Sequence, residues 1–363
     1  MRSCSIILRC VALALLATSV LCAPVARATD AIDETRALHL LDRLGYGPAP
    51  GDLARVRAMG LRAFLDSQLA PLPLPPYLDA RLRQPGAIDA ARAREERLLR
   101  AVASPRQLEE VLCGFWLAHF GIVEGKGLDA AQAGAIGREA VRPHVFGSYA
   151  ALRSAVAQHE AMRGRRISGR SQDDAVRALA GHFVSAPPAA LVRALARRWK
   201  NTGGDQATVL RTLFTSPAFL APAEAGSKRK DALRFVVSAV RASGIAVHDA
   251  APLAEVLARA GSPVYGRVLP MDARERADFV EQLAEGRLML AAPAPRAHEQ
   301  ASTAPPLRAT VEGAAAPGEL AQPGPVLMQA PTPSAAAMAA ARNRPADANE
   351  LKEALSGEAF LRY

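Results

Sequence analysis

The sequence predicts an all-α protein: an irregular array of many helices, with an Ala/Pro-rich disordered segment near the C-terminus. Half of the 363 residues are hydrophobic, which is enough to build a substantial core. Aromatic residues make up only 5% of the composition, and alanine, leucine and arginine dominate. These three residues favour helices, whereas β-branched and aromatic residues favour strands. No alternating run of apolar and polar residues is long enough to predict a strand.

Residues 1–28 have the pattern of a secretory signal peptide. Arg2 and Arg9 supply the positive charge, residues 10–23 form the apolar stretch, and Ala26-Arg27-Ala28 offers a cleavage site. The apolar stretch is shorter than the roughly 20 residues that a membrane-spanning helix needs, although an uncleaved membrane anchor is the alternative. We therefore expect cleavage near Ala28 and an exported mature chain, either periplasmic or secreted.

The mature chain would keep one cysteine, Cys113, because cleavage removes Cys4, Cys10 and Cys22. No intramolecular disulfide is then available. The removed segment holds three arginines and no acids, so the formal net charge falls from +10 to +7. This moderate excess permits weak attraction to anionic envelope polymers, but it is not the concentrated basic patch of a nucleic-acid-binding protein. We therefore expect no nucleic-acid partner.

Residues 29–290 form the predicted helical domain, in which glycine and proline separate stretches of helical periodicity. Leu38, Leu41 and Leu44 recur at three-residue spacing and predict a helix that ends at the Gly-Tyr-Gly-Pro turn, residues 45–48. Further along we expect two short helices at 51–60 and 61–71, an extended proline-rich run at 71–79, one long polar helix at 79–103, and helices that begin after Ser171, after Pro188 and after Lys230.

A further helix is predicted over residues 105–120, where Ser104 and Gln107 have the spacing of a capping box. It contains His119, one of only seven histidines in the chain. On a helical wheel with about 100° per residue, His119 lies about 20° from Leu108, within the apolar stripe. We therefore expect His119 to be a hydrogen-bonded core residue, and a catalytic or metal-binding role is the alternative.

The composition changes after about residue 290. Residues 291–346 consist mainly of alanine, proline and small polar residues and have no periodic apolar face. Such a segment buries too little apolar surface to offset its ordering entropy, so we predict a disordered linker. Helical order is expected to return in a C-terminal segment, residues 347–363.

Two histidines are the candidates for catalysis. His119 and His144 would act in a hydrolase-type enzyme, with or without a metal, if the fold brought an acid to them. The chain contains no HExxH motif, no Gly-x-Ser-x-Gly elbow, no P-loop and no dinucleotide fingerprint. The sequence therefore identifies no cofactor and no metal, and it leans away from an enzyme.

Two basic clusters are the candidates for anion binding. The first lies in a glycine-interrupted loop and consists of Arg163, Arg165, Arg166 and Arg170. The second precedes a predicted helix and consists of Lys228, Arg229 and Lys230. Cations at a helix N-terminus oppose the helix dipole, which favours a bound anion between them. The alternative is that both clusters are solvated turns.

Several stretches together resemble the bacterial family known as domain of unknown function 1800. They are residues 37–71, 108–121, 181–219, 276–288 and 356–363. The resemblance implies a helical, exported protein without a settled activity. It also implies a partner role, because family members often occur next to exported proteins of an alkaline-phosphatase-like fold.

The chain departs from the family pattern at polar positions. Where the family has Trp-His-Asn-His-Phe, this chain has Trp116-Leu117-Ala118-His119, and a long family insert between Met162 and Gln172 is missing. The proline and the acid of the family's Lys-x-Lys-x-Pro-x-Glu pattern are replaced here by Ala232 and Arg234. The leading hypothesis is therefore a divergent, exported binding or accessory protein of the cell envelope. The alternatives are a periplasmic hydrolase-type enzyme and a polyanion-binding surface protein.

Overall fold

The computed structural model describes residues 32–70, 72–168, 171–266, 269–291 and 347–363. Within these ranges every regular element is a helix, and extended pairing is limited to isolated bridges, which confirms the all-α class. The predicted signal peptide, Arg170 and nearly all of the predicted linker lie outside the described residues.

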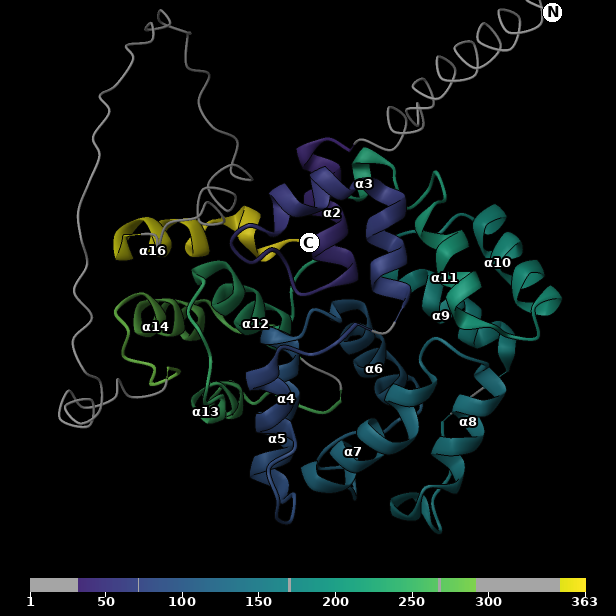
Figure 1. The fold of residues 1–363 in the computed structure, drawn as a ribbon, viewed down its shortest axis with the longest axis horizontal. Helices are drawn as coiled ribbons and strands as arrows, with labels where there is room; N and C mark the ends of the chain where they lie inside the picture. Colours follow the sequence, from purple (N-terminus) through teal and green to yellow (C-terminus); the bar gives the residue numbers. More distant parts are fainter. Residues whose placement is uncertain (1–31, 71, 169–170, 267–268, 292–346) are drawn as a thin grey trace, which may run out of the picture.

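Helix α12 (Ala232–Ser243) is the most deeply buried helix, since each of its residues up to Ala242 is buried. It packs against α5 (Ala90–Ala103), α13 (Ala251–Arg259) and α14 (Ala273–Ala284). The C-terminal helix α16 (Ala348–Ser356) packs on α14, and Figure 1 shows α12, α13, α14 and α16 together on one side of the molecule. Its buried residues include two arginines, Arg234 and Arg241, and buried charged side chains of this kind need hydrogen-bond partners.

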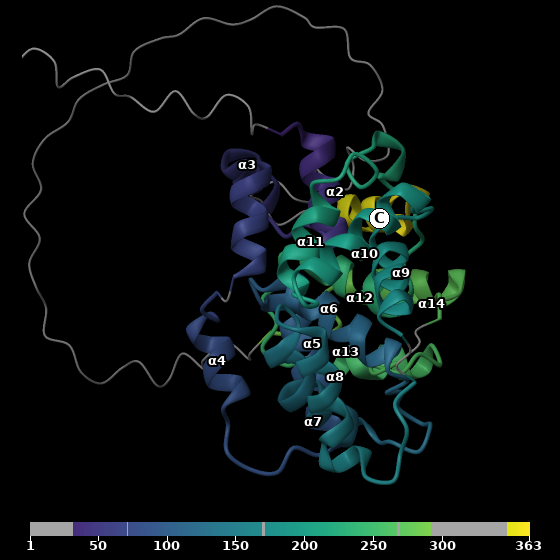
Figure 2. The ribbon, with the colours of Figure 1, turned by 90° about the vertical axis from the view of Figure 1, so that its right-hand side faces the viewer.

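The other side of the molecule consists of α9 (Gln172–Phe183), α10 (Ala189–Asn201) and α11 (Gln206–Phe214), which pack in chain order. Helix α6 (Gln107–His119) contacts α9 as well as two N-terminal helices. These are α2 (Glu34–Leu44) and α3 (Asp52–Leu69), and the turned view of Figure 2 shows α3 along one edge of the molecule.

The remaining elements are short or peripheral. They are the helices α4 (Pro76–Leu82), α7 (Ala130–Ile136) and α8 (Tyr149–Gln158), and the 3-10 or π turns Gly137–Val141, Arg142–His144, Glu160–Met162, Pro222–Glu224 and Glu358–Leu361. None of the helices in the described part of the chain combines the length and the apolar character that crossing a bilayer requires.

Two buried arginines of α12 hold the turn that follows α2. Arg234 Nη1 donates to the carbonyls of Asp42 at 2.7 Å and Gly45 at 2.6 Å. Arg241 donates through Nε to the carbonyl of Gly47 at 2.9 Å. The last carbonyls of a helix have no partner within the helix, and burying them without a donor would be costly. The two guanidinium groups therefore fix the position of α2 relative to α12.

The long polar helix predicted at 79–103 is wrong, because two helices occupy this region. Helix α4 ends near Leu82, and Gly86 has a φ of 114°, which a continuing helix does not allow. Asp89 then caps α5 by accepting from the amide of Arg92 at 2.8 Å. The proline-rich run at 71–79 is also not wholly extended, since α4 begins within it at Pro76, where a proline is favourable.

The predicted capping box of Ser104 and Gln107 is not formed. The residue at the N-cap of α6 is Arg106, and the Gln107 amide group donates to the carbonyls of Ala101 and Ser104 instead. Gln107 Oε1 accepts from the amide of Tyr46 at 3.1 Å, so a long-range contact outcompetes the local cap. By contrast, the predicted helix start at Ser171 is confirmed.

The two short helices predicted at 51–60 and 61–71 are observed as the two arms of α3. Gly60 separates them with a φ of 76° and a ψ of 170°, which interrupts the helical geometry. This backbone region is almost restricted to glycine. Residues 347–363 contain α16 and the 3-10 turn that follows it.

Replacing Gly60 by alanine should lower the free energy of unfolding by about 1–3 kcal/mol, because alanine is strained in this conformation. The matched control is Gly181→Ala within α9, where open space surrounds the added methyl group. This control should leave stability unchanged or raise it by up to about 1 kcal/mol. Urea unfolding of both variants measures the difference, and equal losses would contradict the assigned bend in α3.

Candidate functional site

A cavity of about 400 Å³ lies between α2, α12 and the C-terminal segment, and we call it the His39 cavity. Helix α2 contributes four residues to its lining, namely Thr35, Leu38, His39 and Asp42. Thr35, Leu38 or His39, and Asp42 follow one another at spacings of three or four residues, which places them on one face of the helix. Ser238 lines the cavity from α12, Lys230 lines it from the segment just before α12, and Phe360 belongs to the third wall.

His39 is buried and its two ring nitrogens have different surroundings. Nε2 lies 2.9 Å from the carbonyl oxygen of Phe219, and because a carbonyl can only accept, Nε2 carries the proton. Nδ1 is buried and has no hydrogen-bond partner among the described residues. Burial and the nearby Arg43 lower the pKa of His39 from 6.5 to about 4. A neutral imidazole with an open acceptor nitrogen therefore lines the cavity.

A carboxyl group and an ammonium group share this cavity. Burial raises the pKa of Asp42, while the charges of Lys230, Arg234 and Arg43 oppose the rise. Burial lowers the pKa of Lys230 to about 8, an effect that Asp42 opposes. Displaced pKa values that converge on one cavity are typical of functional sites, although structural ion pairs produce them too.

Behind the cavity, one guanidinium nitrogen of the buried Arg43 binds Ser185 Oγ at 3.4 Å and two further loop residues. This nitrogen, Nη2, donates to Ser227 Oγ at 2.5 Å and to the carbonyl of Glu224 at 2.7 Å, and the Glu224 carboxylate lies 3.3 Å away. Glu224 also accepts from the amide of Ser185 at 2.9 Å. These contacts connect α2 to the loops that follow α9 and α11.

The C-terminal segment closes the cavity. The backbone of Lys228 forms two hydrogen bonds with Tyr363, at 3.1 and 2.8 Å, in an isolated antiparallel bridge. The Tyr363 ring lies under the guanidinium groups of Arg43 and Arg234, at 5.0 and 4.0 Å. Cation–π contacts of this kind stabilise the closed arrangement. In Figure 1 the C-terminus lies beside α2, although the two segments are far apart in sequence.

The bridge separates the predicted basic cluster of Lys228, Arg229 and Lys230. In an extended segment, successive side chains point to opposite sides. Lys228 Nζ accordingly donates inward to the carbonyl of Gly181 at 2.6 Å, and Lys230 Nζ lies 3.6 Å from the centre of the Phe360 ring. Arg229, between them, is exposed. The three residues do not form a single basic surface.

The predicted arginine loop lies on the surface, away from this network. Arg163 pairs with Glu160 at 3.5 Å, and both side chains are more than four-fifths exposed. Arg165 donates to the carbonyl of Gly127, and Arg166 is exposed. Arg170 lies outside the described residues. An exposed ion pair of this kind contributes little to stability or to a defined site.

The two candidate catalytic histidines have different surroundings. His119 is half-buried at the end of α6, where its ring contacts three aromatic residues: Phe115, Trp116 and Phe120, with ring centres 5.3–5.8 Å apart. It therefore lies at the margin of the core rather than within it. His144 is half-buried in a 3-10 turn, and its carbonyl accepts from Gln206 Nε2 at 2.9 Å. Among the described residues, no group of three or more histidine, cysteine or acidic side chains could hold a metal ion.

His39 and Asp42 lie in a helix that the sequence predicts, but the sequence assigned neither residue to a site. Their three-residue spacing was a usable signal, because it puts an imidazole and a carboxylate on the same helix face. The sequence could not show that Lys230 lies opposite them, since this residue is more than 180 positions further along the chain. Lys230 itself was predicted to bind an anion.

The protein-family comparison gave one match. The model described as "Protein of unknown function (DUF1800)" matches residues 39–163 and 174–343, which together cover most of the chain. The break between the two matched segments falls where the family insert is missing from the sequence. The comparisons with curated proteins and with solved structures gave no match.

The unfolding free energy should fall on acidification, and His39 should cause part of this fall. With its pKa lowered from 6.5 to about 4 in the folded state, the unfolded chain binds the proton more tightly, so stability is lost as pH falls from about 6.5 to 4. Between pH 7 and pH 4.5 this loss is about 2 kcal/mol.

The variant His39→Gln keeps a donor for the Phe219 carbonyl and should lose less stability over this pH range than the parent protein. Urea unfolding at the two pH values measures this, with the exposed His248→Gln as a control that should behave like the parent. The half-buried His182, whose pKa desolvation lowers to about 3, titrates in the same way in every variant, so its contribution cancels when variants are compared. Identical pH dependence in His39→Gln and the parent would contradict a buried, neutral His39.

Proposed function

This chain belongs to the DUF1800 family of proteins of unknown function, and we propose that it is an exported binding or accessory protein of the cell envelope. Its ligand would be a small carboxylate that also carries a hydrogen-bond donor, such as an amino acid or a hydroxy acid. The His39 cavity would hold this ligand, and its volume of about 400 Å³ lies in the usual range of ligand pockets.

One observation supports this proposal above the others: His39, whose buried Nδ1 has no hydrogen-bond partner among the described residues, lines a cavity together with Asp42 and Lys230. A buried acceptor without a partner costs stability, so a ligand that donates to Nδ1 removes this cost. The Lys230 ammonium would pair with the ligand carboxylate, and Asp42 would accept from its ammonium or hydroxyl group. The cavity thus has one group for each polar part of the ligand.

The proposed export depends on the sequence pattern of residues 1–28, which has the charged, apolar and small-residue parts of a signal peptide. The family resemblance supports the same location. It also supports an exported partner of alkaline-phosphatase-like fold, which remains a proposal from that resemblance alone.

A second candidate function is an acid–base enzyme that uses the same cavity. Asp42 has a raised pKa and Lys230 has a pKa of about 8, so both groups are displaced toward neutral pH. Pairs of titratable groups displaced in this way are suited to exchanging protons with a substrate. This arrangement supports an enzyme at His39 better than the surroundings of His119 and His144 do.

The variant Lys230→Met should weaken binding of a small amino or hydroxy acid about 10- to 100-fold, because it removes a charged hydrogen bond worth about 1.5–3 kcal/mol. The matched control is Arg229→Met, which removes a neighbouring charge that is exposed and outside the cavity. A ligand is first identified by measuring the melting temperature of the parent protein in the presence of each member of a panel of amino and hydroxy acids. Calorimetry then measures the affinity of the parent and of both variants for that ligand.

A failure of the whole panel to bind would contradict the proposed ligand class. An equal loss of affinity in Arg229→Met and Lys230→Met would contradict the proposed location. If the parent protein converts a bound acid to a product, and Asp42→Asn still binds the acid but no longer converts it, the enzyme is supported over the binding protein.

A further inference from the structure

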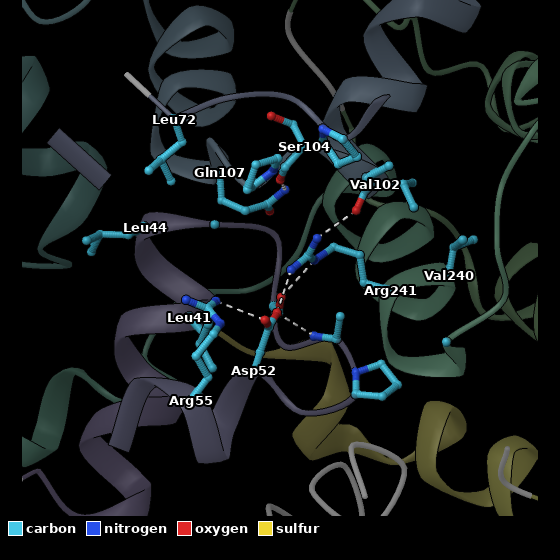
Figure 3. A pocket seen from close by; sticks show the side chains of 18 of the residues that line it. Leu41, Leu44, Asp52, Arg55, Leu72, Val102, Ser104, Gln107, Val240 and Arg241 are labelled. Atoms are coloured by element: carbon cyan, nitrogen blue, oxygen red, sulfur yellow. Dashed lines mark hydrogen bonds and ion pairs between the residues drawn. The ribbon is translucent and has the colours of Figure 1, made fainter. Parts of the chain in front are cut away.

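A second, larger cavity lies on the other side of the turn that Arg234 and Arg241 hold. It is an open cleft of about 750 Å³ between α2, α3, the end of α5 and the end of α12, and we call it the α3 cleft. Gly45 and Gly47 line it from the turn. Figure 3 shows that Leu41, Leu44, Leu72, Val102 and Val240 surround it, together with a group of charged side chains.

The side chains of Ser67, Gln68 and Gln107, which line the α3 cleft, already have partners within the protein. Gln68 donates to the carbonyl of Pro105 and accepts from the amide of Leu108, both at 3.2 Å. Gln107 uses its amide group and its carbonyl within the protein, as described above. Ser67 donates to the carbonyl of Phe64 at 2.7 Å. Walls of this kind offer a ligand apolar contact and no directed hydrogen bond, so the part of the ligand that they enclose must be apolar.

The charged residues that line the α3 cleft are Asp52, Arg55 and Arg241. Figure 3 shows the two arginines approaching the same carboxylate from opposite sides. Arg55 Nη2 lies 2.9 Å from Asp52 Oδ1, and Arg241 Nη2 lies 2.9 Å from Asp52 Oδ2. Because two cations share one anion, this group has a net charge of +1. The cleft is therefore complementary to an anion at this position.

The two arginines differ in their access to solvent. The side chain of Arg241 is 7% exposed and its three nitrogens are all engaged, whereas that of Arg55 is 50% exposed. Tyr77, which also lines the cleft, is 48% exposed. Arginine and tyrosine both combine an apolar body with a polar end, and they are common where one part of a ligand is buried and the other is in water.

We propose that the α3 cleft binds an anionic amphiphile with a single acyl chain. The acyl chain occupies the apolar part between α2, α5 and α12, and the head group lies at the opening beside Arg55. The apolar walls, the engagement of Ser67, Gln68 and Gln107 within the protein, and the net positive charge beside Arg55 all match this chemistry. The bend at Gly60 directs the two arms of α3 around the cleft, so that Met59 and Phe64 both line it. This site shares no lining residue with the His39 cavity.

Calorimetry of the full chain with decanoate, and separately with decanol, tests the proposal at concentrations below micelle formation. The parent protein should bind one decanoate per chain, and Arg55→Ala should weaken decanoate binding about two- to fivefold, the size expected of a half-exposed charge pair. Decanol should bind Arg55→Ala and the parent equally, because it has no charge. The matched control is Arg57→Ala, whose side chain is also 50% exposed but pairs with Glu34 instead and does not line the cleft.

A blocking variant tests the position of the chain. Ala103 is half-buried and lines the cleft, so Ala103→Phe should reduce decanoate affinity at least tenfold. If this variant does not fold, Leu72→Trp provides a second block at another half-buried lining position. Lys230→Met in the His39 cavity should leave decanoate binding unchanged.

Undiminished decanoate binding in a folded blocking variant would overturn the proposal, as would no binding to the parent protein. An equal effect of Arg55→Ala and Arg57→Ala would overturn the assigned head-group position. Binding of an apolar peptide in place of decanoate would identify the cleft as a protein-docking site and would also overturn the proposal.

Discussion

The contact between α12 and the turn after α2 is the constraint on which both cavities depend. Arg234 and Arg241 donate to backbone carbonyls of residues 42, 45 and 47, which α2 by itself leaves without partners. A guanidinium group can satisfy several acceptors in one plane, so two side chains are enough to hold the whole turn. Because the turn is held, one face of α2 lines the His39 cavity and the other faces the α3 cleft.

This contact explains the positive charge at position 234, where the family pattern described above has an acid. In the sequence, Arg234 in place of an acid suggested that a polar constellation had been lost. In the structure, Arg234 contacts two carbonyls and the rings of Tyr46 and Tyr363, at 5.2 and 4.0 Å. Its positive charge also opposes the rise in the pKa of Asp42 and lowers that of Lys230. The substitution therefore contributes to the present site.

The C-terminal segment, residues 347–363, forms one wall of the His39 cavity, although it follows α12 by more than 100 residues in the sequence. The ring of Phe360 packs against Phe235 with ring centres 5.7 Å apart, and it also supports the Lys230 ammonium. The segment thus stabilises α12 on one side and forms a wall of the His39 cavity on the other. A cation over an aromatic face keeps part of its attraction when it is removed from water, which makes a half-buried lysine tolerable here.

The sequence by itself determined the all-α class and the helix starts at Ser171 and after Lys230, because apolar periodicity and capping residues act within a few positions. The prediction was wrong where a residue far away in the sequence supplied the hydrogen bond. The side-chain oxygen of Gln107 accepts from the backbone amide of Tyr46, and Gln107 forms no capping box with Ser104. Only the tertiary structure decided which of Lys228, Arg229 and Lys230 point inward, because their alternation follows from pairing with residues 361–363. The same holds for the His39 cavity, whose walls come from three parts of the chain that only folding brings together.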